Sequence, residues 1–287
     1  MSTTVTEPFS VRSLDVVAET DAHEGPVYTA DEHALYFTSV RRETEVAIKR
    51  LELATGRVEV VWRDTNVANG MVLDGEGRLV VCEQGTFETP ARITRLDRRT
   101  GDLETVVDSC GGLPLNSPND VVVARDGAIW FTDPSYGYLQ GFRPAPRRHD
   151  AVYRHDPATG RTTVVAERFD KPNGLAFSPS ERLLYVTDNG APHHLLAFAV
   201  AGTRLGPSHQ VAVGTPGHPD GLKVDETGRI YASATTGIQV FDPAGRQVGR
   251  VHLPGTVNFT FGGPDRDVLF ITTDTAVWAA ELSTKGA

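Results

Sequence analysis

The sequence has little of what stabilises or localises several common classes of protein. Only two of its 287 residues are cysteines, Cys82 and Cys110, too few for the disulfide framework that supports small secreted domains. No apolar run approaches the roughly 20 residues that a transmembrane helix requires. The opening stretch, MSTTVTEPFSVRSL, lacks the apolar segment of a signal peptide. We therefore expect a soluble, cytoplasmic protein that does not bind membranes.

Basic charge is also scarce. The 28 lysines and arginines are outnumbered by 37 aspartates and glutamates, which gives a net charge of −9 at pH 7 and argues against a nucleic-acid-binding surface. A glycine-rich phosphate-binding loop is absent. Ser117 lacks the strand–turn–helix context of a serine hydrolase nucleophile. The partner that remains is a small-molecule substrate or ligand, and the oligomeric state is left open.

A pattern that recurs along the chain is the main positive signal. In KPNGLAFSPSERLLYVTD, residues 171–188, a polar residue precedes a short apolar run, a polar turn and a second apolar run. This order predicts a β-hairpin that begins just after Asn173. Similar stretches begin at five other polar positions. The six lead residues, as we call them, are Glu24, Asn69, Asn119, Asn173, Asp220 and Asn258.

The spacing of the lead residues predicts the fold class. They are separated by 45, 50, 54, 47 and 38 positions, and an all-β period of roughly 40–50 residues is typical of a propeller. Most units also contain a second hairpin with a Thr-Gly or Ala-Gly turn, such as IKRLELATGRVEVVW. We therefore expect an all-β, six-bladed β-propeller of four-stranded antiparallel blades, formed as a single domain by residues 1–287.

The last unit ends before its fourth strand. The missing strand is found near the start of the chain, where LDVVAETDAHEG resembles TVVAERFDKPNG at 163–174. We expect residues 10–19 to complete the last blade, which would pair an edge that otherwise stays open.

Propeller geometry predicts where a binding site lies. The connection that precedes the first strand of a blade and the connection that follows the second strand lie on the same face. The lead residues should therefore form a ring around the central channel, beside the long connections 83–91, 133–150 and 188–194. Long loops on one rim of a rigid scaffold commonly carry binding sites.

The chemistry of the ring suggests a metal. Each lead residue could cap its own loop, and this simpler explanation is strongest for Asn69 and Asn258. Glu24 is a poor local cap, however, and two carboxylates that converge on one channel mouth would repel each other without a cation. Carboxylate and amide oxygens without sulfur are the donors that a hard divalent ion prefers.

The chain resembles the senescence marker protein/gluconolactonase/luciferin-regenerating family of six-bladed propellers. The resemblance covers essentially the whole chain. It is carried by EGPVY at 24–28, NSPNDVVVARDGAIWFTDPSYG at 116–137, PNGLAFSPSERLLYVTD at 172–188 and HPDGLKVDETGRIY at 218–231. These motifs are weak one by one, because Asn-Gly and Asp-Gly are common turn dipeptides, but their order and spacing are specific.

The resemblance implies one divalent metal ion over the channel. Its motifs place Glu24, Asn173 and Asp220 on the family's metal ligands, and Asn119 on a position that binds the metal or the substrate. Asp220 also matches the residue that acts as general base, or as nucleophile in phosphotriesterase-type relatives. Ca²⁺ is the ion we expect first, with Mg²⁺, Mn²⁺, Zn²⁺ and Fe²⁺ as alternatives.

The sequence departs from sugar-lactonase relatives in two places, and both concern the substrate. Those relatives often carry an arginine two positions before the channel asparagine, where this chain has Ser117, and the loop 133–150 is long. We expect Tyr136 of that loop, His193, Asn69 and Asn119 to contact the substrate.

Several other polar residues have simpler interpretations. His193 and His194 are neighbours on an extended segment, so at most one of them should face the channel. His218 is expected to pack near Asp220 rather than to react. Asp133 and Asp188 end the repeated FTD and VTD motifs, so we expect them to cap strand ends.

These expectations describe a metal-dependent hydrolase that opens a lactone, with the ion polarising the carbonyl and Asp220 as general base. Two alternatives stay open. The same site could act on a phosphotriester or on a metabolite of a specialised pathway, or the propeller could be a binding platform without catalysis.

Overall fold

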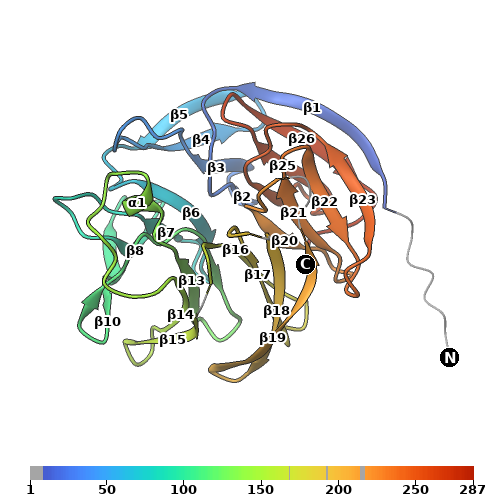
Figure 1. Ribbon diagram of the computed structural model, residues 1–287. Coiled ribbons are helices and arrows are strands. Elements are labelled where there is room, and N and C mark those ends of the chain that lie inside the picture. The colour runs from blue at the N-terminus through green and yellow to red at the C-terminus, as the bar shows by residue number, and fades with distance from the viewer. Residues whose placement is uncertain (1–8, 168, 192, 214–216) are drawn as a thin grey trace.

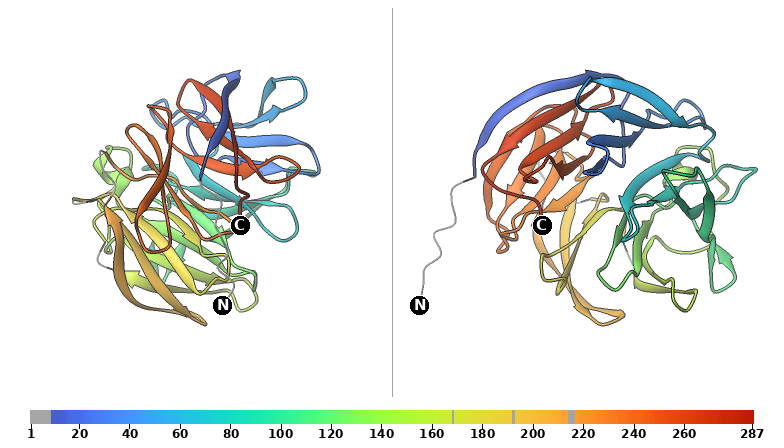
Figure 2. Two further views of the ribbon diagram at one scale, coloured as in Figure 1. Left: turned by 90° about the vertical axis from the view of Figure 1, so that its right-hand side faces the viewer. Right: turned by 180° about the vertical axis from the view of Figure 1, so that it is seen from behind.

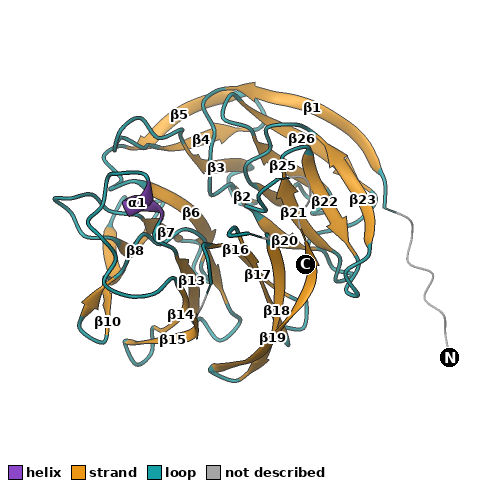
Figure 3. Ribbon diagram, in the orientation of Figure 1, coloured by secondary structure: helices purple, strands orange, loops and turns teal. Residues whose placement is uncertain are grey.

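The computed structural model describes residues 9–167, 169–191, 193–213 and 217–287, and its sheets form a six-bladed β-propeller (Figures 1 and 3). Each blade is a four-stranded antiparallel sheet, which confirms the predicted fold class. The strands of the first three blades are β2 (Val27–Thr29), β3 (Ala34–Thr38), β4 (Ile48–Glu52) and β5 (Arg57–Trp62); β6 (Ala68–Leu73), β7 (Leu79–Glu83), β8 (Arg92–Leu96) and β9 (Leu103–Val107); and β12 (Val121–Val123), β13 (Ile129–Asp133), β14 (Ala151–Asp156) and β15 (Arg161–Glu167). The strands of the next two blades are β16 (Pro172–Phe177), β17 (Leu183–Asp188), β18 (His194–Ala201) and β19 (Arg204–Val213); and β20 (Leu222–Val224), β21 (Ile230–Ala234), β22 (Gly237–Phe241) and β23 (Gln247–His252).

The sixth blade joins the two ends of the chain. Its sheet has the order β1-β26-β25-β24, with β1 (Val11–Glu19), β24 (Phe259–Gly262), β25 (Val268–Thr272) and β26 (Ala276–Leu282). In the register, Val11 lies opposite Leu282 and Glu19 lies opposite Ala276. The blue strand β1 runs along the outer side of the red blade (Figures 1 and 2). The prediction that residues 10–19 complete the last blade is therefore confirmed.

The hydrophobic core is divided into six clusters, one between each pair of neighbouring blades. Between the third and fourth blades, for example, Trp130 packs with Leu175 and Leu184. The inner strands β3, β7, β13, β21 and β22 are buried along their whole length, because a blade is covered on both faces. Burial on both faces explains why these segments are continuous apolar runs rather than alternating ones.

The first strands of the blades form a closed ring around the axis. Each contacts the first strand of the next blade, and β24 of the last blade contacts β2 of the first. Glycines allow this close approach. The backbone N–H of Gly70 donates to the carbonyl oxygen of Asn119 at 2.8 Å, and Gly174 donates to that of Asp220 at 3.1 Å. A Cβ on Gly70 would lie 2.5 Å from the Asn119 oxygen, so a larger residue would push the two blades apart.

Hydroxyl groups make a second set of links between neighbouring blades. Thr132 at the end of β13 donates its Oγ1 hydrogen to the carbonyl oxygen of Asn173 at 2.7 Å. Thr187 reaches the carbonyl of Asp220 at 3.1 Å, and Thr272 reaches that of His23 at 2.6 Å. The Thr132 oxygen also accepts the backbone N–H of Asp120. These bonds fix the backbone at the lead residues Asn173 and Asp220.

Two lead residues lie inside a strand rather than before one, which corrects the predicted start of the hairpin. Asn69 belongs to β6 and Asn173 to β16, and the register with the following strand shifts between Ala68 and Met71 and between Pro172 and Leu175. Each shift is a bulge formed around an Asn-Gly pair. A bulge changes the direction of a side chain within a strand. Asn69 and Asn173 can therefore belong to a strand and still direct their side chains into the channel.

The long connections contain two elements that the repeat did not predict. The loop after β13 forms the one-turn helix α1 (Tyr136–Leu139), and β10 (Ser109–Cys110) pairs with β11 (Leu113–Pro114) in a short ribbon (Figure 3). No helix within the described residues is both long and apolar enough to cross a membrane.

Replacing Thr132 by valine tests the importance of the hydroxyl links. The substitution keeps the shape of the side chain but leaves the Asp120 N–H and the Asn173 carbonyl without their buried partner. We expect the free energy of unfolding to fall by about 1–3 kcal/mol, measured by urea denaturation at constant m-value. Thr163→Val in the outer strand β15, where the hydroxyl makes one long contact of 3.4 Å, is the control. Equal urea midpoints for the Thr132→Val and Thr163→Val variants would show that the hydrogen bond between Thr132 and Asn173 does not stabilise the fold.

Candidate functional site

Five of the six lead residues line one cavity at the end of the channel, with a volume of about 270 Å³. They are Glu24, Asn69, Asn119, Asn173 and Asp220. The cavity is completed by Tyr136 from α1 and by residues of the long connections. Six of the seven residues predicted for the site therefore lie together. The seventh, His193, is outside the lining.

Glu24 is held by the sixth lead residue. Asn258 donates from Nδ2 to Glu24 Oε2 at 2.6 Å, and the backbone N–H of Gly25 donates to the same oxygen at 3.2 Å. The Asn258 side chain also accepts the N–H of Phe259 at 2.7 Å, so it does cap its own loop, as the simpler interpretation expected. Both hydrogen bonds to the Glu24 carboxylate reach Oε2. The other oxygen, Oε1, is therefore the one available to a ligand.

Asp220 has a fixed backbone and one carboxylate oxygen without a partner among the described residues. Its N–H donates to Ser233 Oγ at 3.1 Å, and its carbonyl accepts from Gly174 and Thr187. Its Oδ1 atom is buried and has no hydrogen-bond partner within the described part of the chain. The same is true of Oδ1 of Asn69, so the capping interpretation is not observed for that residue. Buried oxygen atoms without partners are uncommon and usually indicate a missing ligand, ion or water.

The raised pKa values of Asp220 and Glu24 also indicate a site for a cation. Burial raises the pKa of Asp220 well above its usual range, and the charge of Glu24 adds to this effect. Burial also raises the pKa of Glu24, although His23 and the Asn258 hydrogen bond act against the shift. A cation between the two groups would remove the penalty for their ionisation.

Tyr136 fixes the orientation of Asn173. The Nδ2 group of Asn173 donates to the phenol oxygen at 3.3 Å, and Nδ2 of Asn189 donates to the same oxygen at 3.0 Å. With its nitrogen directed at the phenol, the Asn173 amide can present its oxygen to the cavity. Because the Tyr136 oxygen accepts both of these bonds, its own hydrogen remains available for donation.

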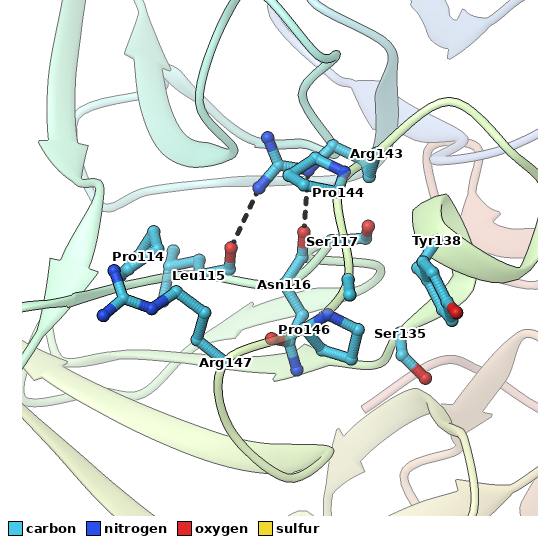
Figure 4. A pocket seen from close by; sticks show the side chains of 11 residues that line it. Pro114, Leu115, Asn116, Ser117, Ser135, Tyr138, Arg143, Pro144, Pro146 and Arg147 are labelled. Atoms are coloured by element: carbon cyan, nitrogen blue, oxygen red, sulfur yellow. Dashed lines mark hydrogen bonds between the residues drawn. The ribbon is translucent and has the colours of Figure 1, made fainter.

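A second, smaller cavity next to α1 shows how the long loop is anchored (Figure 4). Arg143 donates to the carbonyl oxygens of Asn116 at 3.1 Å and Leu115 at 3.0 Å. Ser117 Oγ accepts the N–H of Gly137 in α1 at 3.0 Å. Ser117, the residue at which the sequence departs from sugar-lactonase relatives, is therefore buried and bonded to the backbone of α1.

The acids at the ends of the second strands support the loops that lead into the ring. Asp133 accepts the backbone N–H groups of Asn116 at 2.8 Å and Ser117 at 2.7 Å. Burial raises the pKa of Asp133 to about 7, although these N–H groups favour its ionised form. Asp188 accepts the N–H of Asp170 at 3.0 Å in the fourth blade. Both carboxylates thus bind the loop that precedes their blade, whereas the sequence predicted that they cap the ends of their own strands.

One wall of the cavity is apolar and contains a strained residue. Val46, Val67 and Ala68 form this wall. Val67 has φ = 59°, a left-handed conformation that is a genuine outlier for a β-branched residue. Its carbonyl accepts the N–H of Gln84 at 3.0 Å, which helps to hold the conformation. Strain of this kind tends to persist where a site requires it.

The histidines have different environments. Nδ1 of His23 lies 2.6 Å from Asp274 Oδ1. Burial lowers the pKa of His23, but the Asp274 hydrogen bond and the charges of Glu24 and Asp220 outweigh it, so the pKa is raised. His193 instead packs its ring edge-on against His218, with ring centres 4.3 Å apart, and its Nδ1 lies 3.1 Å from the carbonyl oxygen of Asn189.

Six polar lining residues are not predicted by the sequence: Asn189, Gln84, Ser39, His23, Arg41 and Gln140. Asn189 and Gln84 each follow the last residue of the second strand of a blade, as does Ser39, which also lines the cavity. The position after the second strand is therefore a repeated signal that could have identified them. Arg41 and Gln140 lie in irregular loops and have no such signal.

The donor set fits a hard cation better than a soft one. No group of three or more His, Cys, Asp or Glu side chains arranged to bind a metal occurs among the described residues. The cavity instead combines two carboxylates with the amides of Asn69, Asn119 and Asn173, and one oxygen each of Asp220 and Asn69 has no partner in the part of the chain that the structure describes. Such a set of oxygen donors suits ions of the Ca²⁺ or Mg²⁺ type.

Known proteins resemble the chain over most of its length. Residues 22–275 match the model of the SMP-30/Gluconolactonase/LRE-like region. A gluconolactonase of Zymomonas mobilis is 29% identical over 86% of this chain and 73% of its own. A lactonohydrolase of Aspergillus oryzae is 28% identical over 87% of this chain and 65% of its own. The solved structure of a gluconolactonase from Xanthomonas campestris superposes with a TM-score of 0.85, at 33% identity over 97% of this chain and 96% of that one.

The raised pKa of Asp220 predicts how a neutral substitute affects stability. The pKa of Asp220 in the folded protein is above its unfolded value of about 4. Ionisation of Asp220 therefore costs no folding stability below pH 4, and the full cost is present above the raised pKa. We expect Asp220→Asn to be more stable than the wild type at pH 7–8 in the presence of a chelator, with an advantage that disappears near pH 4. Denaturant unfolding over this pH range measures the difference.

The matched control is Asp225→Asn. Asp225 is also buried, but it accepts hydrogen bonds from Arg229, Tyr231 and Thr284. Its replacement should destabilise the protein by roughly 1–3 kcal/mol. If Asp220→Asn is instead less stable than the wild type at pH 8, the two carboxylates do not repel each other as described.

Proposed function

Since this chain belongs to the SMP-30/gluconolactonase/LRE-like family, we propose that it is a hydrolase that opens lactone rings in the cavity around Asp220. The observation that carries the proposal is the convergence of Glu24 and Asp220 in one cavity, with an unpartnered, buried oxygen on Asp220. A binding platform without catalysis would gain nothing from two buried acids that repel each other.

We propose that Glu24, Asn173 and Asp220 hold one divalent ion, with Asn119 beside it. Oxygen donors favour Ca²⁺, while Mg²⁺, Mn²⁺, Zn²⁺ and Fe²⁺ are the alternatives to test. A bound ion of this kind polarises a carbonyl group and stabilises negative charge on its oxygen.

We propose Asp220 as the residue that removes a proton from water. In the proposed reaction, the water oxygen bonds to the lactone carbonyl carbon while Asp220 accepts the water's proton. The bond between that carbon and the ring oxygen then breaks. The ring oxygen takes up the proton, which gives a hydroxy acid and returns Asp220 to its starting state. A general base of this kind contributes about 10²–10⁴ in rate.

We propose that Tyr136 donates a hydrogen bond to the reacting oxygen atoms. Burial raises the pKa of its phenol, and the nearby charge of Asp220 raises it further, so the hydroxyl stays protonated at any working pH. The two amides that donate to the phenol oxygen fix its position. A fixed donor costs little reorganisation when charge develops on the substrate.

The metal hypothesis is tested by calorimetry on chelator-stripped protein with Ca²⁺, Mg²⁺, Mn²⁺, Zn²⁺ and Fe²⁺. We expect one ion per chain to bind the wild type, Asp220→Ala to abolish binding, and Asp265→Ala, a change at an exposed acid, to leave it intact. Wild-type protein that binds none of these ions would refute the metal site.

Turnover is then measured on a panel of neutral aldonolactones with the ion that binds. Ring opening that disappears with the chelator supports the lactonase. Ion binding without lactone turnover would instead favour a different substrate, such as a phosphotriester, for the same site.

Replacing Tyr136 by phenylalanine tests the proposed donor. We expect kcat for lactone opening to fall about 10²-fold, as for the loss of one oxyanion donor. Tyr138→Phe, on the exposed side of the same helix, is the control and should keep full activity. If Tyr136→Phe changes only the affinity for the ion and not kcat of the saturated enzyme, Tyr136 positions Asn173 and does not act on the substrate.

A further inference from the structure

Arg41 lines the cavity that contains Glu24 and Asp220, and it comes from the connection between β3 and β4 of the first blade. Of the described residues that line this cavity, it is the single arginine, and no lysine accompanies it. Arg41 is half-buried, so its positive charge is within reach of a ligand that enters the cavity.

The position of Arg41 is fixed by neutral groups. Its guanidinium carbon lies 4.5 Å from the ring centre of the buried Phe142. Its Nη2 donates to Oε1 of Gln140 at 3.0 Å, and its Nη1 donates to the backbone carbonyl of Glu43. Gln140 and Phe142 belong to the long loop of the third blade, so the arginine spans from one loop to another across the rim.

None of these contacts neutralises the charge. Among the described residues, no carboxylate lies within ion-pair distance of Arg41, whereas Arg50 pairs with Glu32 at 2.8 Å and Arg92 pairs with Glu83 at 2.6 Å. The guanidinium has five N–H groups, and two of them are used. The remaining donors, held in a planar group that is stacked on an aromatic ring, are preorganised for a carboxylate.

We propose that Arg41 is the anion-binding subsite of this cavity and that the natural substrate is a lactone with a carboxylate of its own, as in the monolactone of an aldaric acid. This inference rests on the proposed lactone hydrolysis. The lactone carbonyl lies at the acidic floor near Glu24 and Asp220, and the carboxylate of the substrate pairs with Arg41 at the rim. The arginine thereby supplies the cationic contact that Ser117, turned beneath α1, does not provide.

The test compares two lactones of equal ring size, a neutral aldonolactone and a monolactone of an aldaric acid, with the ion-loaded wild type and Arg41→Gln. A hydrogen bond to a charged group is worth about 1.5–3 kcal/mol, so kcat/KM for the carboxylated lactone should fall roughly 10- to 100-fold. The neutral lactone should change less than about threefold, which is within what a lost polar contact produces. Arg42→Gln, at the next and exposed residue outside this cavity, is the control and should affect neither substrate.

Other outcomes overturn the inference. An equal loss of kcat/KM on both lactones would show that Arg41 has a structural role, in which it connects the loops of the first and third blades. No loss on either would show that it does not meet the substrate. In both cases lactone hydrolysis itself would stand.

If the wild type opens neither lactone, the proposed function fails, and Arg41 is examined by binding alone. Calorimetric titration of the ion-loaded protein with the open-chain aldarate and aldonate then tests whether Arg41 binds a carboxylate. A preference for the aldarate that Arg41→Gln removes supports the subsite, and equal affinities contradict it.

Discussion

The central constraint in this molecule is the use of the lead-residue backbone as the link between blades. The carbonyl of Asp220 accepts from Gly174 and Thr187 of the preceding blade, and the carbonyl of Asn173 accepts from Thr132. These bonds fix the backbone at both residues, and the side chains of both residues line the cavity. The stability of the ring and the placement of the polar side chains therefore have the same cause.

The ring concentrates polar atoms that are unfavourable without a ligand. Asp220 and Glu24 share a buried cavity, and Oδ1 atoms of Asp220 and Asn69 lack partners among the described residues. The fold can accommodate these polar atoms because its apolar packing lies in six separate clusters between the blades, away from the axis. The apolar clusters between the blades stabilise the fold. The unfavourable burial of charge is limited to the axis, where an ion or a substrate can offset it.

The sequence was sufficient for the fold and for most of the cavity, because both depend on signals that repeat. The spacing of the lead residues predicted six blades, the match between the two chain ends predicted β1, and the ring positions identified Glu24, Asn119, Asn173 and Asp220. The Asn-Gly bulges, the burial of Ser117 beneath α1 and the location of Arg41 were not predictable in this way. They depend on how one irregular loop packs on another, and such contacts leave no period in the sequence.

The pairing of β1 with β26 also has a consequence for the order of assembly. Val11 and Leu282 lie opposite each other, although 271 positions separate them in the chain. During synthesis β1 must therefore wait for β26, which is made much later, and loop-closure entropy makes such distant pairings slow. Five blades can form in sequence while the ring remains an open arc with unpaired edges at both ends. Closure is a late event, and the interval before it is when the nascent chain is most exposed to aggregation.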